Sequence, residues 1–398
     1  MTFPITGQTL TKTTIETAPA HNHVRACDLV AKFRALNKER SLGWATRFEN
    51  LKLLGMGGQG VVYRSESRGA DGFRKPIALK VFSPEVYFSP QDYESDMGRI
   101  ARVAARVAGV QHDHLLDIHN FVEHGGVRVM LMEWVDGYDL RHLLGKQMLV
   151  GMRSRIDRRR WMHLNDVVIA EGPIRSRLKP GIAIQILREC LIGLASLHRA
   201  GLAHGDIKPD NIMLKRTGNV KLVDFGATID LRNPGVRIAW TPTYAAPEVL
   251  KGAMNSAQSD LASLGYVFLE LLSGTVLFDS TASVDELLHA KHSLPGRLDQ
   301  LLPPDVLRDM ELTELCRILC DPDPEHRVRS AEEANLEWAV NVHRRLVKTG
   351  LDSDYENDIR IWMEALPPEE KEKMEPAKLV VRRGDAEPLW FGESTILL

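Results

Sequence analysis

The chain has 398 residues and a formal net charge of -2. This length predicts one large two-lobed domain with extensions, or about two to three domains, and the near-neutral charge gives no general reason to expect a nucleic-acid or anionic-membrane partner. The four cysteines are scattered along the chain, which excludes a disulfide framework and indicates no zinc site.

The first 47 residues precede the main domain. Residues 1–23 are polar and rich in threonine, which predicts a disordered tail, and residues 24–47 carry apolar side chains at helical spacing, which predicts a helical extension. Residues 1–20 lack the charged start and apolar core of a signal peptide. No apolar run reaches the roughly 18 residues that span a bilayer. We therefore expect a cytoplasmic protein without a membrane partner.

A glycine-rich turn follows the first predicted strand, residues 48–54. Residues 55–63 read GMGGQGVVY. A G-x-G-x-x-G pattern alone is weak evidence, because dinucleotide-binding folds share it. Here β-branched Val61 and Val62 follow, and they favour a second strand instead of a helix. Such a hairpin can cover phosphates, since backbone N–H groups approach closely where no Cβ intervenes. The alternative is a plain glycine-rich hairpin.

The next apolar segment contains a lysine. Residues 76–82 read PIALKVF, and Lys80 is costly to bury there unless it is paired. A helix is predicted over residues 91–110, with Glu94 and Asp96 in its first turns and no carboxylate in its middle. We choose Glu94 as the partner of Lys80, with Asp96 as the second candidate. The alternative is that Glu94 is a surface residue.

Two later stretches bring together the groups that phosphoryl transfer needs. Residues 204–211 read HGDIKPDN and residues 224–226 read DFG. One carboxylate can orient or deprotonate a hydroxyl, an amide and a second carboxylate can hold Mg²⁺, and a lysine can neutralise the moving phosphate. Both stretches are bounded by apolar runs, which predicts that they lie at the ends of buried strands and helices.

The glycine-rich turn, the segment with Lys80 and the two polar stretches, in this order along the chain, resemble the motifs of the eukaryotic-like (Hanks-type) serine/threonine protein kinase family. The sequence HGDIKPDN resembles the form found in bacterial members of the family. The resemblance extends over about residues 48–345 and includes the APE sequence at 246–248, Asp260 and Arg327. It implies a two-lobed α+β fold. A small antiparallel β lobe with one main helix would span residues 48–135, a larger helical lobe residues 136–348, and an extension residues 349–398.

The resemblance also implies a site that uses ATP and Mg²⁺ and phosphorylates serine or threonine in proteins. Asp206 would be the catalytic base, Lys208 would lie beside the γ-phosphate, and Lys80 would hold the α- and β-phosphates. Asn211 and Asp224 would bind the metal. Met132 would be the gatekeeper, and the backbone of the hinge would bind adenine. The residues that would bind the nucleotide are Leu54, Gly55, Gly57, Gly60, Val62, Ala78, Lys80, Met132, Glu133, Val135 and Met213.

Three features bear on control and partners. Gly205 stands where the family usually has an arginine that receives a phosphate on the activation loop, and residues 229–240 contain no Ser, Thr or Tyr. We therefore predict activity without activation-loop phosphorylation. An insertion at about residues 145–180 is either a solvated loop or a docking patch for an acidic partner, with nucleic acid less favoured. The basic residues on which this interpretation rests are Arg153, Arg155, Arg158, Arg159, Arg160, Arg175, Arg177 and Lys179.

Two rival functions stay open. His-Gly-Asp also occurs in aminoglycoside and choline kinases, which phosphorylate small molecules, but Lys208, the DFG sequence and the APE sequence favour a protein acceptor. Lys208 and Thr241 together favour Ser/Thr over Tyr. The second rival is a pseudokinase or scaffold, which the uncertain partner of Lys80 and the extensions would fit. The extension at 349–398, with a helix predicted over 355–366, could pack on the domain, bind a partner or occlude the site.

Overall fold

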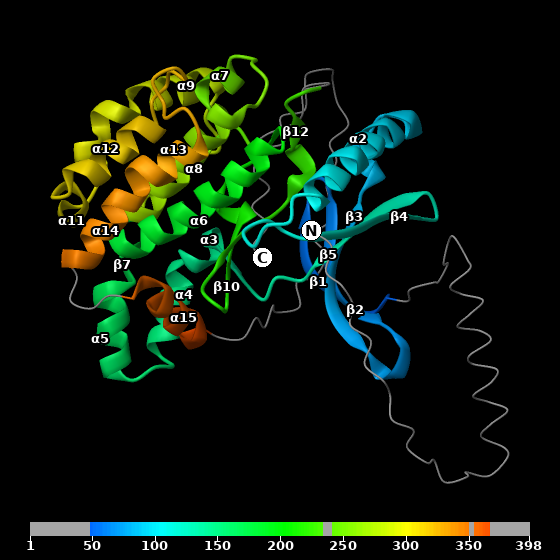
Figure 1. The fold of residues 1–398 in the computed structure, drawn as a ribbon, viewed down its shortest axis with the longest axis horizontal. Coiled ribbons are helices and arrows are strands. Elements are labelled where there is room, and N and C mark those ends of the chain that lie inside the picture. The colour runs from blue at the N-terminus through cyan, green and yellow to red at the C-terminus, as the bar shows by residue number, and fades with distance from the viewer. Residues whose placement is uncertain (1–47, 234–240, 350–353, 367–398) are drawn as a thin grey trace, which may run out of the picture. The chain divides into compact units, whose positions relative to one another are not determined.

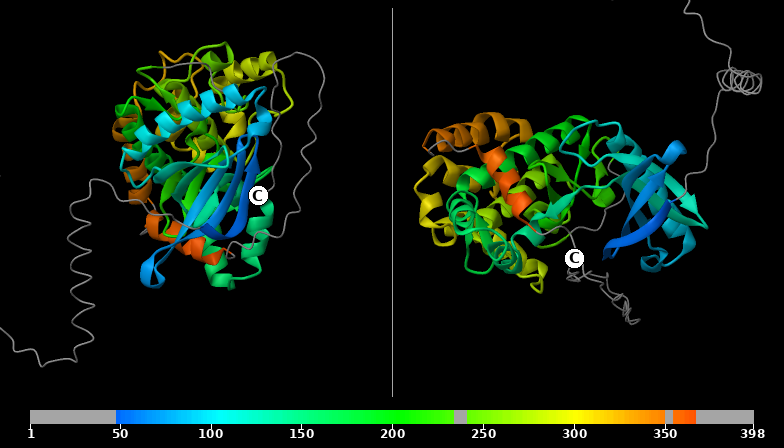
Figure 2. Two further views of the ribbon diagram at one scale, coloured as in Figure 1. Left: turned by 90° about the vertical axis from the view of Figure 1, so that its right-hand side faces the viewer. Right: turned by 90° about the horizontal axis from the view of Figure 1, so that it is seen from below.

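The structure is a computed structural model that describes residues 48–233, 241–349 and 354–366. The predicted tail (1–23), the predicted helical extension (24–47) and the end of the C-terminal extension (367–398) lie outside the described residues. The first described strand begins at Phe48. The predicted two-lobed α+β fold is confirmed, and Figure 2 shows the sheet and the helices in separate regions.

A five-stranded antiparallel sheet forms the N-terminal lobe, in the spatial order β1-β2-β3-β5-β4 (Figure 1). Helix α2 (Pro90–Ala108) begins at a cap where the Ser89 hydroxyl accepts from the N–H of Asp92. The buried stripe of α2, with Met97, Ile100 and Val107, packs into the core. The strands are β1 (Phe48–Gly57), β2 (Gly60–Arg68), β3 (Arg74–Phe82), β4 (Ile118–His124) and β5 (Val127–Glu133).

Helices make up most of the C-terminal lobe. Its two central helices are α6 (Pro180–Arg199) and α8 (Ala257–Ser273), which pack against each other in the apolar core. Within the described residues, α6 is long and apolar enough to cross a bilayer, but most of it is buried, as in a core helix. The other helices are α3 (Leu140–Leu143), α7 (Pro247–Leu250), α9 (Val284–Ser293), α10 (Leu298–Leu301), α11 (Pro304–Leu307), α12 (Met310–Leu319), α13 (Ala331–Glu333) and α14 (Val340–Thr349).

Short strands position the polar loops, and all of them except β6 lie between α6 and α8 in the chain. A three-stranded sheet has the order β11-β10-β6, and β12 pairs with β9. Loop 204–211 starts at the end of β9 and runs into β10, and residues 224–226 lie just after β11, which ends at Leu222. The strands are β6 (Gly137–Asp139), β9 (Leu202–Ala203), β10 (Ile212–Lys215), β11 (Val220–Leu222) and β12 (Ile229–Asp230).

The insertion folds, and the C-terminal helix packs on it. The insertion contains α4 (Lys146–Arg153), α5 (Arg158–Val167), β7 (Ile169–Glu171) and β8 (Ser176–Leu178). The predicted helix over residues 355–366 is confirmed by α15 (Tyr355–Ala365), which lies beside α5 in Figure 1.

Polar contacts join α5 to α15. Arg160 donates to the carbonyl of Ile361 at 2.9 Å, and His163 Nε2 lies 2.9 Å from the buried Asp358 carboxylate. The described part of the C-terminal extension is thus a packed element of the C-terminal lobe.

Candidate active site

Loop 204–211 is held by Asp260, a buried carboxylate on α8. The backbone N–H groups of His204 and Gly205 donate to its two oxygens, each at 2.8 Å. The His198 ring nitrogen lies 2.9 Å from Oδ2 of the same carboxylate. Both oxygens of a side chain that is only 1% exposed are therefore satisfied. Asp260, which belongs to the family resemblance, therefore anchors this loop to α8.

The Asp206 carboxylate is the centre of a hydrogen-bonded cluster. Its Oδ1 accepts from the Thr241 hydroxyl at 2.7 Å, and its Oδ2 accepts from the Asn211 amide at 3.0 Å. Lys208 Nζ lies 2.9 Å from Asp206 Oδ2 and donates to Thr241 Oγ1 at 2.9 Å. Burial lowers the pKa of Lys208, but the charge and hydrogen bond of Asp206 act in the opposite direction and outweigh burial. The pKa of Lys208 therefore lies above its usual range, and its amine is a cation at neutral pH.

Asp224 lies beside this cluster with an unusual backbone conformation. Its φ of 62° and ψ of 82° are left-handed, which is uncommon for a residue with a Cβ and occurs often at functional sites. The N–H of Val223 donates to the carbonyl of Asn211 at 2.9 Å, which brings the two predicted metal ligands onto neighbouring segments.

The oxygen donors of Asn211 and Asp224 fit Mg²⁺. This ion prefers oxygen ligands and commonly uses one or two carboxylates together with substrate phosphates. The Asn211 amide nitrogen is already bonded to Asp206, which leaves its side-chain oxygen for a metal. In the described part of the chain, no cluster of three or more His, Cys, Asp or Glu side chains offers an alternative metal site.

Lys80 binds Asp224 and Gln59, not the carboxylates of α2. Its Nζ lies 2.6 Å from Asp224 Oδ1 and donates to Gln59 Oε1 at 3.0 Å. Burial raises the pKa of Asp224, but the charge and hydrogen bond of Lys80 outweigh burial and lower this pKa to about 2. The Asp224 carboxylate is therefore ionised at neutral pH and able to bind a cation.

The predicted pairing of Lys80 with Glu94 or Asp96 is wrong in this structure. Glu94 is exposed, while Asp96 accepts from the Tyr87 hydroxyl and from Arg99, each at 2.7 Å. Both carboxylates lie in the first turns of α2. Further along the helix, Arg99 faces the metal loop and donates to the carbonyl of Gly226 at 3.2 Å. A cation at this point of α2 cannot pair with Lys80.

Gln59 is the residue at this site that sequence reasoning missed. Its side chain reaches from the glycine turn to Lys80, and a Cβ on Gly226 would lie 2.2 Å from Gln59 Oε1. One signal was present in the sequence. Gln59 is the sole hydrogen-bonding side chain in the turn 55–60. The structure therefore adds a neutral acceptor for Lys80 where a carboxylate was expected.

Most of the residues predicted to bind the nucleotide lie on or next to strands of the N-terminal sheet, while Met213 lies on β10. Ala78 lies opposite Met132 in the pairing of β3 with β5, and both are buried, as is Val135. The half-buried members Leu54, Val62 and Met213 pack against the same core. Gly60 has a φ of +143°, and a Cβ there would lie 2.0 Å from the carbonyl of Val81, so this position requires glycine.

The side chain of Glu133 faces away from this region. Its carboxylate accepts from the N–H of Asp117 at 2.8 Å and forms an ion pair with Lys221. The N–H of Glu133 also donates to the carbonyl of Asp117 at 2.9 Å. The predicted use of the hinge backbone for adenine stays a prediction.

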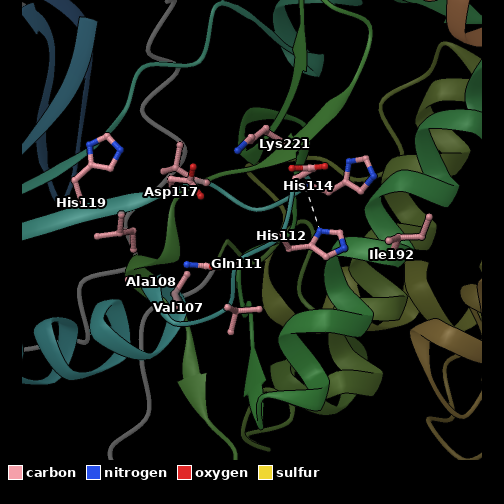
Figure 3. A pocket seen from close by; sticks show the side chains of 13 residues that line it. Val107, Ala108, Gln111, His112, His114, Asp117, His119, Ile192 and Lys221 are labelled. Atoms are coloured by element: carbon pink, nitrogen blue, oxygen red, sulfur yellow. Dashed lines mark hydrogen bonds between the residues drawn. The ribbon is translucent and has the colours of Figure 1, made fainter. Parts of the chain in front are cut away.

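A pocket of about 650 Å³ lies away from these residues, between the end of α2, α6 and β11 (Figure 3). Its lining includes the imidazoles of His112, His114 and His119, and Lys221. Burial lowers the pKa of His112 and of His119, so both rings are neutral at neutral pH. None of the residues predicted to bind nucleotide or metal lines this pocket, so it is separate from the site around Asp206.

Comparison with known proteins identifies the family. The model of the family described as "Protein kinase domain" matches residues 48–339. Among curated proteins, serine/threonine-protein kinase PrkC of Bacillus subtilis is 26% identical over 326 residues, 80% of this chain and 42% of that protein. Serine/threonine-protein kinase PkaB of Streptomyces coelicolor is 30% identical over 303 residues, 69% of this chain and 63% of that protein.

A third relative has a similar extent of match. Serine/threonine-protein kinase PknL of Mycobacterium tuberculosis is 31% identical over 235 residues, 57% of this chain and 50% of that protein. In all three cases this chain spans less than two thirds of the relative's length. The family match covers well over half of this chain and contains Lys80, Asp206, Asn211 and Asp224. The chain therefore belongs to the protein kinase family.

Proposed function

We propose that the protein transfers the γ-phosphate of ATP, with Mg²⁺, to serine or threonine hydroxyls of protein substrates. One observation carries the proposal: Asp206, Lys208 and Thr241 form a single hydrogen-bonded cluster next to Asn211 and Asp224. The relatives named above are serine/threonine-protein kinases, which supports the same acceptor class. We propose domain boundaries of 48–135 for the N-terminal lobe, 136–348 for the C-terminal lobe and 349–398 for the extension.

Each residue of the cluster has a distinct task in this reaction. Asp206 orients the acceptor hydroxyl and takes up its proton, and the Thr241 hydroxyl fixes the direction of the Asp206 carboxylate. The ammonium groups of Lys208 and Lys80 stabilise negative charge on the phosphates. Asn211 and Asp224 hold Mg²⁺, which neutralises phosphate charge when it is bound.

A transfer assay separates this function from its rivals. The protein is incubated with γ-labelled ATP, Mg²⁺ and a generic protein substrate, with Asp206→Ala as the control. We expect label on serine and threonine of the substrate with the wild-type protein only. Label on an aminoglycoside or choline and not on protein would favour a small-molecule kinase. Label on no acceptor would favour a scaffold.

The surroundings of the activation segment support activity without phosphorylation there. Thr228 is fully buried and donates to the carbonyl of His204 at 3.2 Å, while Thr243 and Tyr244 are buried as well. Gly205 has a φ of +78°, and a Cβ there would lie 2.4 Å from the carbonyl of Ala227. A side chain able to receive a phosphate would therefore strain the backbone at this position. Residues 234–240 lie outside the described residues.

We expect phosphatase treatment to leave the transfer rate unchanged. No Ser, Thr or Tyr occurs in residues 229–240, and the neighbouring hydroxyls are buried or bonded within the site. The measurement is the initial rate before and after treatment, with mass spectrometry of the segment 228–244. Activity that is lost on treatment and restored by ATP, together with a phosphate on Thr228, Thr241, Thr243 or Tyr244, would contradict the prediction.

Neutralising the carboxylate on α2 is expected to have little effect. Glu94→Gln should keep the wild-type rate, because Glu94 is exposed and Lys80 binds Asp224 instead. Asp224→Asn should lose most activity, because it removes a metal ligand and the ionic partner of Lys80. Initial rates over a range of Mg²⁺ concentrations test both variants. A large loss in Glu94→Gln would show that α2 moves its carboxylate to Lys80 during the reaction.

The exposed part of the insertion is where we propose that an acidic partner docks. Arg160, Arg175 and Arg177 make internal contacts with Ile361, Glu270 and Asp305. The exposed arginines at the junction of α4 and α5 are Arg153, Arg155, Arg158 and Arg159. Within the described residues, Cys190, Cys316 and Cys320 are free thiols, which supports a reducing compartment and our proposal of a cytoplasmic location.

A further inference from the structure

Lys291 is a fully buried lysine without a role in the site described above. It lies on α9 and has an exposed fraction of 0%. Its Nζ donates to the carbonyl of Thr243, and it stands 3.8 Å from the centre of the Phe278 ring and 4.3 Å from that of Tyr266. Burying a lysine is costly without compensation, and here one carbonyl and two aromatic faces supply it.

The carbonyl that Lys291 holds belongs to a short turn that reaches the active site. The N–H groups of Tyr244 and Ala245 donate to the carbonyl of Thr241 at 3.1 and 3.0 Å. At the start of this turn, the Thr241 hydroxyl donates to Asp206 and accepts from Lys208. The position of the turn 241–245 therefore determines how Thr241 meets Asp206.

Buried side chains of α8 and α9 hold this turn from beneath. The Tyr244 hydroxyl donates to Glu270 at 2.8 Å, and the Ser263 hydroxyl donates to the carbonyl of Tyr244 at 2.8 Å. Lys291 supplies the third contact, at Thr243, and it is the one that comes from α9. Without Lys291, the Thr243 carbonyl would lose this buried hydrogen bond and its link to α9.

The contact does not depend on the charge of Lys291. Burial lowers the pKa of Lys291 well below its usual range, while Cys320 and Glu270 act to raise it. Burial also raises the pKa of Glu270. A neutral amine still carries N–H groups, so Lys291 donates to Thr243 in either protonation state.

We infer that Lys291 is a positioning residue for the acceptor side of the active site. It holds the Thr243 carbonyl, which fixes the turn 241–245 and, through Thr241, the direction of the Asp206 carboxylate. Lys291 is far too buried to touch the acceptor itself, so it acts only through this turn. The kinetic consequences of this inference rest on the proposed function. The effect of Lys291 on the position of the turn 241–245 does not.

The test is Lys291→Met, which keeps an unbranched apolar stem and removes the donor. We expect kcat/KM for a protein substrate to fall on the order of ten-fold, because the loss of one buried hydrogen bond costs roughly this much in an equilibrium. KM for ATP should stay at the wild-type value. A lysine that only fills space predicts the reverse: unchanged kinetics with an equal or higher unfolding midpoint. That result would overturn the inference.

Two further measurements keep the test decisive. Hydrogen exchange at Tyr244 and Ala245 should speed up in Lys291→Met, and this readout needs no activity, so it separates the inference from the proposed function. If the wild-type protein transfers no phosphate, faster exchange alone still supports the positioning role, and unchanged exchange overturns it. If Lys291→Met does not fold, Lys291→Gln replaces it. Its shorter side chain draws the donor back from Thr243, so we expect the same kinetic and exchange changes.

Discussion

Replacing Asp206 by asparagine is expected to lower kcat by about 10²- to 10⁴-fold, the usual contribution of a positioned general base. The asparagine has nearly the same shape and can still meet Thr241 and Asn211, whose donors lie 2.7 and 3.0 Å from the carboxylate. It cannot take up the proton of the acceptor hydroxyl. The measurement is the transfer rate at saturating ATP and protein substrate.

The matched control is Asp113→Asn, which makes the same change at an exposed carboxylate beside the separate pocket. We expect this control to keep the wild-type rate. Both variants should bind ATP and unfold at the wild-type temperature. If Asp206→Asn keeps a rate close to that of the wild type, another group must accept the proton and the proposed role of Asp206 is wrong.

Replacing Trp362 by alanine is expected to lower the free energy of unfolding by about 3–5 kcal/mol, as large aromatic truncations in a core do. Trp362 on α15 is only 1% exposed, and its neighbours Ile359 and Met363 on the same helix are fully buried. The helix also fits closely against α6, since a Cβ on Gly181 would lie 2.1 Å from the ring of Tyr355. Chemical denaturation measures the change.

Arg360→Ala is the control on the same helix. Arg360 is about half exposed and pairs with Glu364 at 2.6 Å, and exposed pairs of this kind contribute on the order of 0–1 kcal/mol. Equal stability of the wild type and Trp362→Ala would show that α15 does not pack on the C-terminal lobe in solution. A large loss of stability in Trp362→Ala would mean that a truncation before residue 354 removes part of the core. Lower activity after such a truncation would then reflect instability of the protein and not the loss of an activating segment.

The chemistry of the site was predictable because its groups are local in sequence. His204 to Asn211 form one continuous loop, and the backbone alone places Asp206, Lys208 and Asn211 close together. The glycine turn was predictable for a related reason. Gly60 tolerates no side chain next to Val81, so the steric requirement appears directly in the sequence. Helices α2 and α15 were also predicted from the sequence, over residues 91–110 and 355–366.

The partner of Lys80 was not predictable in this way. Its choice depends on which face of α2 meets the metal loop, and in the structure that face carries Arg99, which binds Gly226. Lys80 therefore binds Asp224, which is 144 positions later in the chain, and Gln59 in the glycine turn. Spacing along a helix gives the relative directions of its side chains, but not the rotation at which the helix packs.

The insertion and Lys291 also show that the sequence alone did not predict which charged side chains are buried. The basic residues of the insertion looked like one solvated or docking surface, yet Arg160, Arg175 and Arg177 turn inward to α15, Glu270 and Asp305. Lys291 drew no attention in the sequence, because a lysine in an amphipathic helix is normally solvated. The amino-acid sequence by itself determined the family, the reactive groups and the helices and strands, since these depend on residue type and local spacing. Only the tertiary structure decided which buried charges meet, because those contacts join α2, α8, α9 and α15 to loops distant in the chain, and packing alone sets their orientation.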